Sequence, residues 1–260
     1  MKKRMTKEGS KPLKQPLKKQ TLLFDLDDTL VHCNKYFNMV LDQFADLMTT
    51  WFAGYRLTKD EVKRKQYEID VPGVHRLGFV AEHFPQSLAD TYDHYCAVTG
   101  REPSTEERNR LYELGMSVYE QTVEPYPHMA ETLERLQSQG HLLCLYTGGE
   151  SAIQYKKVRQ MGLDVFFGDR VFVSAHKTTG VLESILRRHR FDRASTWMIG
   201  NSIRTDIVPA LEAEINAIYI PALSEWPFNV VDIRVKPKRF FLRLQSLLEV
   251  PPAILRHSSS

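Results

Sequence analysis

Residues 22–29 read Leu22-Leu23-Phe24-Asp25-Leu26-Asp27-Asp28-Thr29, an apolar run that ends abruptly in three carboxylates and a hydroxyl. A buried strand followed at once by acidic residues places charge at the carboxyl edge of a sheet, where open α/β sheets bind their ligands. Two carboxylates at positions i and i+2 repel each other unless a cation or a shared proton offsets their charge. The stretch therefore predicts a Mg²⁺ site, a site of proton transfer, or both.

The pattern that follows Pro125 and Pro127 predicts an α/β fold. Short apolar runs alternate there with helical segments of about ten residues, which is typical of right-handed βαβ units and a parallel sheet. The first strand, 21–24, must join this sheet because it has no other partner. The expected elements are strands at 142–146, 171–173, 196–199 and 217–220 and helices at 129–137, 151–161, 179–189 and 206–213.

The segment between the first strand and the alternating half reads almost wholly as helices. Residues 36–52 carry apolar side chains at helical spacing, and Thr58 precedes an acidic first helical turn. We therefore expect a Rossmann-like α/β core interrupted by an all-helical insertion. The predicted organisation is a basic tail at 1–20, a catalytic core at 21–32 and 125–250, a helical cap at 33–124, a last packing helix at 239–249 and a C-terminal tail at 251–260.

The composition is typical of a globular protein with a strongly basic N-terminal segment. The 260 residues are 42% hydrophobic and 26% charged, and no long apolar run predicts a membrane span. Residues 1–20 carry eight basic residues against Glu8, so this tail holds a charge of +7 and the rest of the chain −4 of the total +3. We expect the tail to be disordered; a contact with nucleic acid is an open alternative that no interleaved aromatic residue strengthens. Three scattered cysteines without a CxxC pair, and no secretory signal before Leu22, predict a cytoplasmic protein.

Polar groups follow three further strands at the points where these strands are expected to end. Thr147 and Gly148 follow the strand at 142–146, and Lys177 follows the strand at 171–173. Asn201 and Asp206 follow the strand at 196–199. Because parallel strands end at one edge of a sheet, these groups are expected to face one crevice with the acids of residues 25–28.

The ordered motifs resemble those of the haloacid dehalogenase-like hydrolase superfamily. The resemblance rests on Asp25-x-Asp27-x-Thr29, Thr147, Lys177 and Gly200-Asn201-x4-Asp206, and it covers roughly residues 20–221. One motif alone is weak, but four in order, each at a strand end, are a strong match. Asn201 stands where many members have Asp, although some read Gly-Asn-Ser there. The resemblance implies a Mg²⁺-dependent phosphatase with a helical cap over a Rossmann-like core.

The implied roles agree with elementary chemistry. Asp25 is expected to attack phosphorus and form an aspartyl phosphate, and Asp27 to exchange protons with the leaving group and with water. Mg²⁺ is expected to bind Asp25, the backbone carbonyl of Asp27, and Asn201 or Asp206. Phosphate oxygens are expected to bind Lys177, Thr147 and the Gly148 N–H, while Thr29 fixes the loop and Asp28 takes no part.

Asp27 favours a phosphatase over a dehalogenase, because a departing halide needs no proton. A cap over the crevice predicts a small phosphorylated metabolite as the substrate, with Asn34 and Tyr36 as candidate contacts. Two alternatives stay open. A phosphomutase would return the phosphoryl group to its substrate, and a binding or regulatory protein would have lost turnover and would use the basic tail. The sequence does not predict the oligomeric state.

Overall fold

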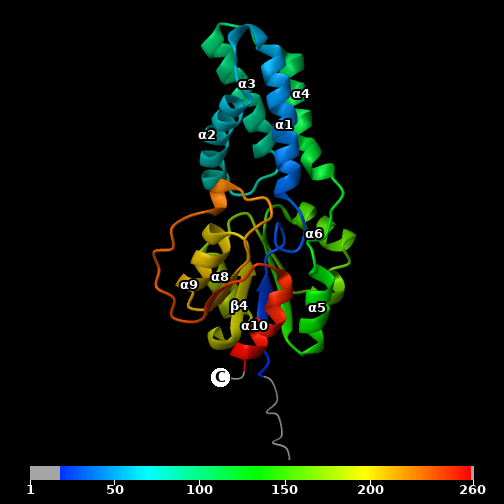
Figure 1. Cartoon of the computed structure of the whole chain (residues 1–260), viewed down its shortest axis with the longest axis vertical. Helices are drawn as coiled ribbons and strands as arrows, with labels where there is room; N and C mark the ends of the chain where they lie inside the picture. The colour runs from blue at the N-terminus through cyan, green and yellow to red at the C-terminus, as the bar shows by residue number, and fades with distance from the viewer. Residues whose placement is uncertain (1–17, 259–260) are drawn as a thin grey trace, which may run out of the picture.

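The computed structural model describes residues 18–258, and its centre is one six-stranded sheet with the order β3-β2-β1-β4-β5-β6 (Figure 1). Every neighbouring pair of strands is parallel, which confirms the predicted α/β class. The first strand lies between β2 and β4, so the chain winds outward from it in both directions. The strands are β1 (Thr21–Phe24), β2 (Leu142–Gly148), β3 (Val171–Ser174), β4 (Thr196–Gly200), β5 (Asn216–Tyr219) and β6 (Phe241–Arg243).

Helices cover both faces of this sheet. Leu22 and Phe24 of β1 pack on the face that also holds side chains of α5, α6, α7 and α10, whereas Leu23 packs on the face of α8 and α9. Alternate side chains of a strand point to opposite faces, so β1 is buried on both and reads as a continuous apolar run. These helices are α5 (Met129–Ser138), α6 (Ser151–Gln160), α7 (Asp164–Phe167), α8 (Thr179–Arg188), α9 (Val208–Glu212) and α10 (Val250–His257).

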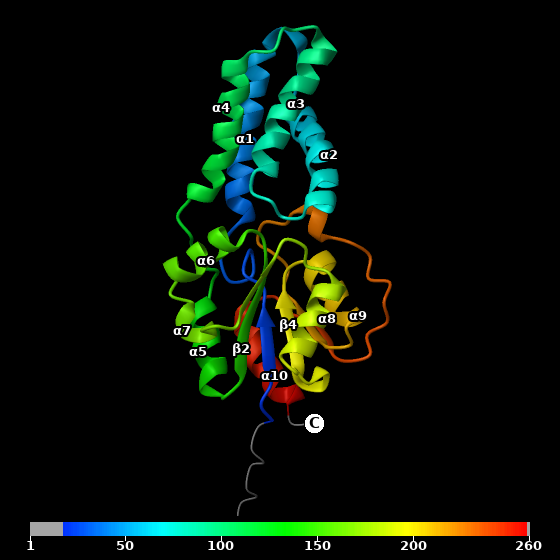
Figure 2. The ribbon, with the colours of Figure 1, turned by 180° about the vertical axis from the view of Figure 1, so that it is seen from behind.

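Four further helices, inserted between β1 and α5, stand beyond the carboxyl ends of the strands (Figures 1 and 2). We call residues 34–120 the helical unit. It has a core of its own, in which Phe44 and Met48 of the first helix pack with Leu88 and Leu111. Its elements are α1 (Asn34–Trp51), η1 (Ala53–Tyr55), α2 (Lys59–Leu77), α3 (His83–Thr99), α4 (Thr105–Met116) and η2 (Ser117–Glu120).

The C-terminal part of the sequence prediction is wrong. Residues 239–249 form no long helix, because Phe241–Arg243 pairs with β5 as the edge strand β6. The predicted tail at 251–260 contains α10 instead. Prolines at the first helical positions cost no hydrogen bond, and Val250, Ala253 and Ile254 are buried against the sheet. Most of the predicted basic tail, residues 1–17, lies outside the described residues.

Candidate active site

Lys177 joins two buried carboxylates at the carboxyl edge of the sheet. Its Nζ lies 2.7 Å from Oδ1 of Asp25 and also donates to Oδ1 of Asp206. All three residues are buried, and the ammonium group lies 4.9 Å from the centre of the Tyr146 ring. Burial by itself lowers the pKa of an amine, but Asp206 and Asp25 raise the pKa of Lys177 above its ordinary value, so it stays charged.

Asp25 sits directly after β1, and its environment shifts the pKa of its carboxyl group. Burial raises the pKa of Asp25 to about 7, which outweighs the opposing effect of Lys177. Asp206 raises it further, because two carboxylates share one ammonium group. A second cation beside Asp25 would remove this penalty. With two carboxylates and one ammonium group, the cluster carries one negative charge that is not balanced.

Asn201 and Thr29 lie beside this cluster. We call Asp25, Thr29, Lys177, Asn201 and Asp206 the floor of the site. The Thr29 hydroxyl lies 3.0 Å from Asp25 Oδ2 and 3.3 Å from Asn201 Oδ1, so Thr29 ties the loop down as predicted. Asp206 Oδ2 accepts the Ser202 N–H at 2.9 Å. A Cβ on Gly200 would collide with the Asp206 carboxyl group, so this close approach requires glycine.

The donor set of the floor fits Mg²⁺. Within residues 18–258, no three His, Cys, Asp or Glu side chains lie close enough to hold a metal ion alone. Asp25 and Asp206 supply carboxylate oxygens and Asn201 an amide oxygen. Mg²⁺ commonly takes one or two carboxylates, keeps several waters and completes its shell with substrate phosphate. These hard oxygen groups and the unbalanced negative charge suit such an ion.

Asp27 is held by two side chains that the sequence reading missed. Lys157 Nζ lies 2.6 Å from Asp27 Oδ1, and Gln154 Nε2 lies 2.9 Å from Asp27 Oδ2. Burial by itself lowers the pKa of Lys157, but the Asp27 carboxylate raises it above its ordinary value. One feature of the sequence could have pointed to these residues. Gln154 and Lys157 are three positions apart, so they lie on one face of the helix that follows Thr147.

Thr147 and Gly148 end β2 beside this cluster. Thr147 is fully buried, and α6 begins three residues after Gly148, so its positive end lies next to the turn. A Cβ on Gly148 would lie 2.6 Å from the Phe79 ring, so only glycine permits this approach of the helical unit. The structure thus brings Thr147, Gly148 and Lys177 to the sheet edge that holds Asp25.

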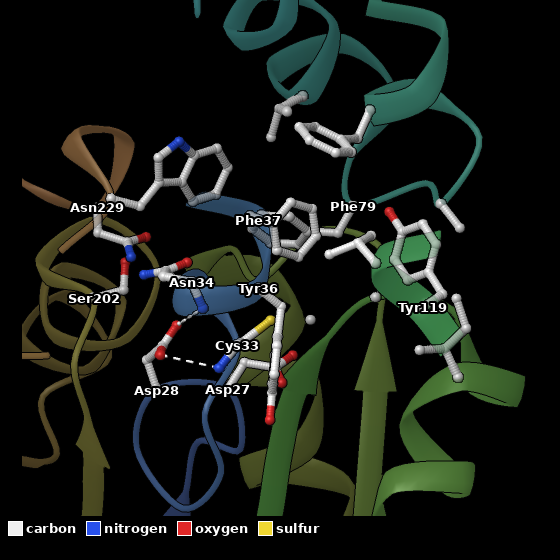
Figure 3. A pocket seen from close by; sticks show the side chains of 18 of the residues that line it. Asp27, Asp28, Cys33, Asn34, Tyr36, Phe37, Phe79, Tyr119, Ser202 and Asn229 are labelled. Carbon is white, nitrogen blue, oxygen red and sulfur yellow. Dashed lines mark hydrogen bonds between the residues drawn. The ribbon is translucent and has the colours of Figure 1, made fainter. Parts of the chain in front are cut away.

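Asp28 lies in the same loop but has a structural role. It is buried with a φ of 59°, and its carboxylate accepts the N–H groups of Cys33 and Asn34 at 3.1 and 2.8 Å (Figure 3). Burial raises the pKa of Asp28 to about 7. Asp28 therefore fixes the start of α1, which leads into the helical unit.

Asn34 and Tyr36 line the cavity above the site, but other contacts use their polar ends. Asn34 Nδ2 donates to the Ser224 carbonyl at 2.8 Å. The Tyr36 hydroxyl donates to the Thr122 carbonyl at 2.7 Å and lies 2.8 Å from Glu124 Oε1. Substrate contact by either residue stays a prediction, and the structure gives both a role in joining the helical unit to the core.

A cavity of about 460 Å³ lies between this floor and the helical unit. Asp25, Asp27 and Lys177 line it from below, and α1, α2 and the loop around Trp226 line it from above and the side. Figure 3 shows Phe37, Phe79 and Tyr119 on the side of the helical unit. Asp25, Asp27 and Lys177 therefore lie at the bottom of a covered chamber.

The sheet order and the carboxylates at the strand ends define a Rossmann-like α/β protein with a helical insertion. The family model of a haloacid dehalogenase-like hydrolase matches residues 19–214, so the chain belongs to this family. Among curated proteins, it is 26% identical over 210 residues to a glyceraldehyde 3-phosphate phosphatase of Methanothermobacter thermautotrophicus, covering 77% of this chain and 85% of that protein.

Solved structures agree on the fold. A haloacid dehalogenase-like family hydrolase from Xanthomonas campestris has a TM-score of 0.74 at 20% identity and covers 94% of this chain and 97% of its own. A predicted phosphoglycolate phosphatase from Haemophilus somnus has a TM-score of 0.56 at 17% identity, with coverage of 90% and 97%. At these identities the likeness shows the fold alone. No helix of the described residues is long and apolar enough to cross a membrane.

Proposed function

We propose that this protein is a Mg²⁺-dependent phosphatase that hydrolyses a phosphorylated metabolite through an aspartyl phosphate on Asp25. The observation that carries the proposal is the buried Asp25–Lys177–Asp206 cluster, with Asp27 beside it, at the strand ends below a covered chamber. Its similarity to a phosphatase supports the reaction type. Mg²⁺, the intermediate and the residue roles are proposals.

Asp25 is the nucleophile. Thr29 holds its Oδ2 and Lys177 its Oδ1, so the carboxylate is fixed before substrate arrives. Lys177 and Thr147 stabilise the negative charge on the phosphoryl oxygens during attack. Asp25 Oδ forms the new bond to phosphorus while the bond from phosphorus to the leaving oxygen breaks.

Asp27 carries the proton. It protonates the leaving alkoxide, and the resulting carboxylate then removes a proton from the water that attacks phosphorus. Hydrolysis frees Asp25 and returns Asp27 to its protonated form. Lys157 and Gln154 hold the carboxylate form of Asp27, which is the form that removes the proton from water.

Asp25, the Asp27 carbonyl, Asn201 and Asp206 are the groups that would hold Mg²⁺. When bound, the ion offsets the charge of the carboxylates and of the phosphoryl group, which otherwise repel each other. Asp206 also keeps Lys177 charged and in place. The helical unit acts as the cap that closes the chamber over these groups.

The test is release of inorganic phosphate from a panel of phosphate monoesters in the presence and absence of Mg²⁺. Asp25→Asn should abolish release, because the amide is no nucleophile. Asp169→Asn is the matched control, since the Asp169 side chain is 96% exposed and remote from the cluster. Release that persists in Asp25→Asn would refute the proposal, and isomerised substrate without free phosphate would show a mutase instead.

A further inference from the structure

We propose that the leaving group of the substrate carries a bulky apolar body, alkyl or aromatic, and not a polyhydroxylated one. This inference rests on the proposed function, because it names the class of phosphate monoester that the chamber above Asp25 accepts. The contacts that carry it are those between the helical unit and the core.

The chamber is larger than a three-carbon substrate such as glyceraldehyde 3-phosphate needs. Its volume of about 460 Å³ falls in the range of roughly 300–1,000 Å³ that encloses drug-sized ligands. A phosphoryl group occupies only the floor, next to Thr147 and Lys177. Most of the chamber therefore lies above the phosphate site and is available to the leaving group.

The wall around this upper space is mostly apolar. Four of its half-buried aromatic side chains come from four separate segments of the chain. These side chains are Phe37 of α1, Phe79 of the α2–α3 loop, Tyr119 of η2 and Trp226 of the loop after β5. Figure 3 shows Phe37, Phe79 and Tyr119 above Cys33 and Asp27, and the rings of Phe37 and Tyr119 lie 6.0 Å apart between centres. Aromatic faces that are incompletely covered by protein gain free energy when an apolar ligand covers them.

Phe79 stands next to the phosphate site. Its ring approaches Gly148 so closely that a Cβ there would lie 2.6 Å away. The backbone holds this position, because the Phe79 N–H donates to the Ala175 carbonyl at 2.9 Å. Trp226 lies 6.4 Å from the Phe79 ring, between ring centres, and stacks on Phe228 at 4.5 Å. The first atoms beyond the ester oxygen therefore meet an aromatic surface that is fixed in advance.

Several polar side chains of the wall are already engaged within the protein. Asn34 donates to Ser224, Gln66 Nε2 donates to the Ser87 hydroxyl at 2.8 Å, and the Tyr36 hydroxyl contacts Glu124. Each sugar hydroxyl that enters without a partner loses its hydrogen bonds to water at a cost of roughly 1–3 kcal/mol. Among the described residues, two buried oxygens of the wall, Asp70 Oδ1 and Gln154 Oε1, lack a hydrogen-bond partner and can each accept from a hydroxyl group. The chamber thus favours a substrate with few hydroxyl groups over a polyhydroxylated one.

The experiment compares primary alkyl phosphates, because their leaving alcohols have similar acidity. Phosphate release from ethyl, butyl, hexyl and 3-phenylpropyl phosphate is measured on the full chain with Mg²⁺, beside glyceraldehyde 3-phosphate and glucose 6-phosphate. We expect kcat/KM to rise by about fourfold for each added methylene group until the chamber is filled. The two polar substrates should be slower than hexyl phosphate.

Substitutions in the aromatic wall test whether it causes the preference for apolar leaving groups. Trp226→Ala should lower kcat/KM for 3-phenylpropyl phosphate by about tenfold or more, and change ethyl phosphate by less than about threefold. Phe79→Ala should lower kcat/KM for both esters, because the Phe79 ring lies beside the phosphate site. Tyr55→Ala is the matched control, because Tyr55 is a half-exposed aromatic residue that does not line the chamber. It should leave both substrates unchanged.

A binding measurement separates this inference from the proposed function. Alkyl phosphonates of the same lengths resist hydrolysis, and calorimetry on the full chain with Mg²⁺ measures their affinity directly. Affinity that rises with chain length while no ester is hydrolysed would uphold the inference and refute the phosphatase. Fast hydrolysis of the polar substrates with no gain along the alkyl series would overturn the inference and leave the phosphatase standing. Phosphonate affinity that is independent of length would also overturn it.

Discussion

Asp27 receives hydrogen bonds on both carboxyl oxygens, one from Lys157 and one from Gln154. In the proposed mechanism Asp27 carries the proton, and a carboxylate held at both oxygens keeps one orientation, so errors in that orientation cost rate. We therefore expect Lys157→Met to lower kcat for alkyl phosphates by roughly 10²-fold, the lower end of what acid–base catalysis contributes. For p-nitrophenyl phosphate the loss should be much smaller, since its leaving group needs no proton.

Steady-state kinetics with both esters test this role for Lys157. Lys157→Arg should recover part of kcat, because it restores a cation that can bind Asp27. Arg159→Met, on an exposed position of the same helix, serves as the control. Equal losses for the two esters would mean that Lys157 supports the structure and does not position Asp27.

Asn201 makes the floor one charge less negative than an aspartate would. We expect Asn201→Asp to lower the Mg²⁺ concentration at half-saturation by about tenfold, a free-energy change of ~1.4 kcal/mol that a nearby unit charge readily supplies. Aspartate still accepts the hydrogen bond from Thr29, so the loop should keep its geometry. Calorimetric Mg²⁺ titration and activity should shift together; no shift in either would show that position 201 does not contact the ion.

The sequence predicted that polar groups from several strand ends meet at one edge of the sheet, but it did not predict every partner of these groups. Asp25 follows β1 directly, and Lys177 and Asp206 lie three and six residues past the ends of β3 and β4, so the parallel sheet brings all three to one edge. Lys157 reaches Asp27 across 130 positions of sequence, through the turn between β2 and α6. No local pattern specifies such a contact, because it depends on how that turn orients the helix.

Elements with strong local patterns were predicted well, and short ones at the C-terminal end were not. The prediction for β1 at 21–24 agrees with the structure, as an apolar run buried on both faces leaves little choice. β6 has three residues and was read as part of a helix. Residues 251–260 were predicted to be a tail, yet most of them belong to α10, whose paired prolines occupy the first turn, where a missing N–H costs nothing.

His141 makes the start of β2 sensitive to pH. It is buried, its Nδ1 accepts the Gln20 N–H at 3.2 Å, and burial lowers the pKa of His141 below the ordinary 6.5. The unfolded chain therefore takes up this proton at a higher pH than the folded chain. The stability that the neutral ring contributes is complete above pH 6.5 and is lost as the pH falls through the lowered pKa.

His141→Gln removes the titrating group while keeping an acceptor for Gln20. We expect the unfolding free energy of this variant to fall less than that of the parent between about pH 7 and pH 5. Glutamine does not titrate, so position 141 no longer binds a proton preferentially in the unfolded state. Urea unfolding at the two pH values measures the difference. His94→Gln on α3 is the control, and identical pH dependence in parent and His141→Gln would contradict the argument.

The molecule consists of two separately packed parts joined by a narrow connection. The helical unit has its own core, and the chain crosses between the parts only beside Val31 and Pro125, within the described residues. The sequence predicted the insertion, because its helical pattern breaks the α/β rhythm. It could not predict the docking contacts, which form between loops distant in sequence, such as the Ala81 N–H donating to Glu150 Oε1 at 2.8 Å.

Substitution of Glu150 tests whether the contact between the helical unit and the core affects substrate binding in the chamber. The bond between Glu150 and Ala81 holds the loop that carries Phe79 above Gly148, and hydrogen bonds to a charged group contribute about 1.5–3 kcal/mol when buried. Glu150 is exposed, so we expect Glu150→Ala to raise KM only about three- to tenfold, with little change in kcat for substrates already bound. Glu134→Ala on α5 is the control. A fall in kcat at constant KM would instead place Glu150 among the groups that act on the phosphoryl centre, since α6 begins beside it and Asp27 contacts the same helix.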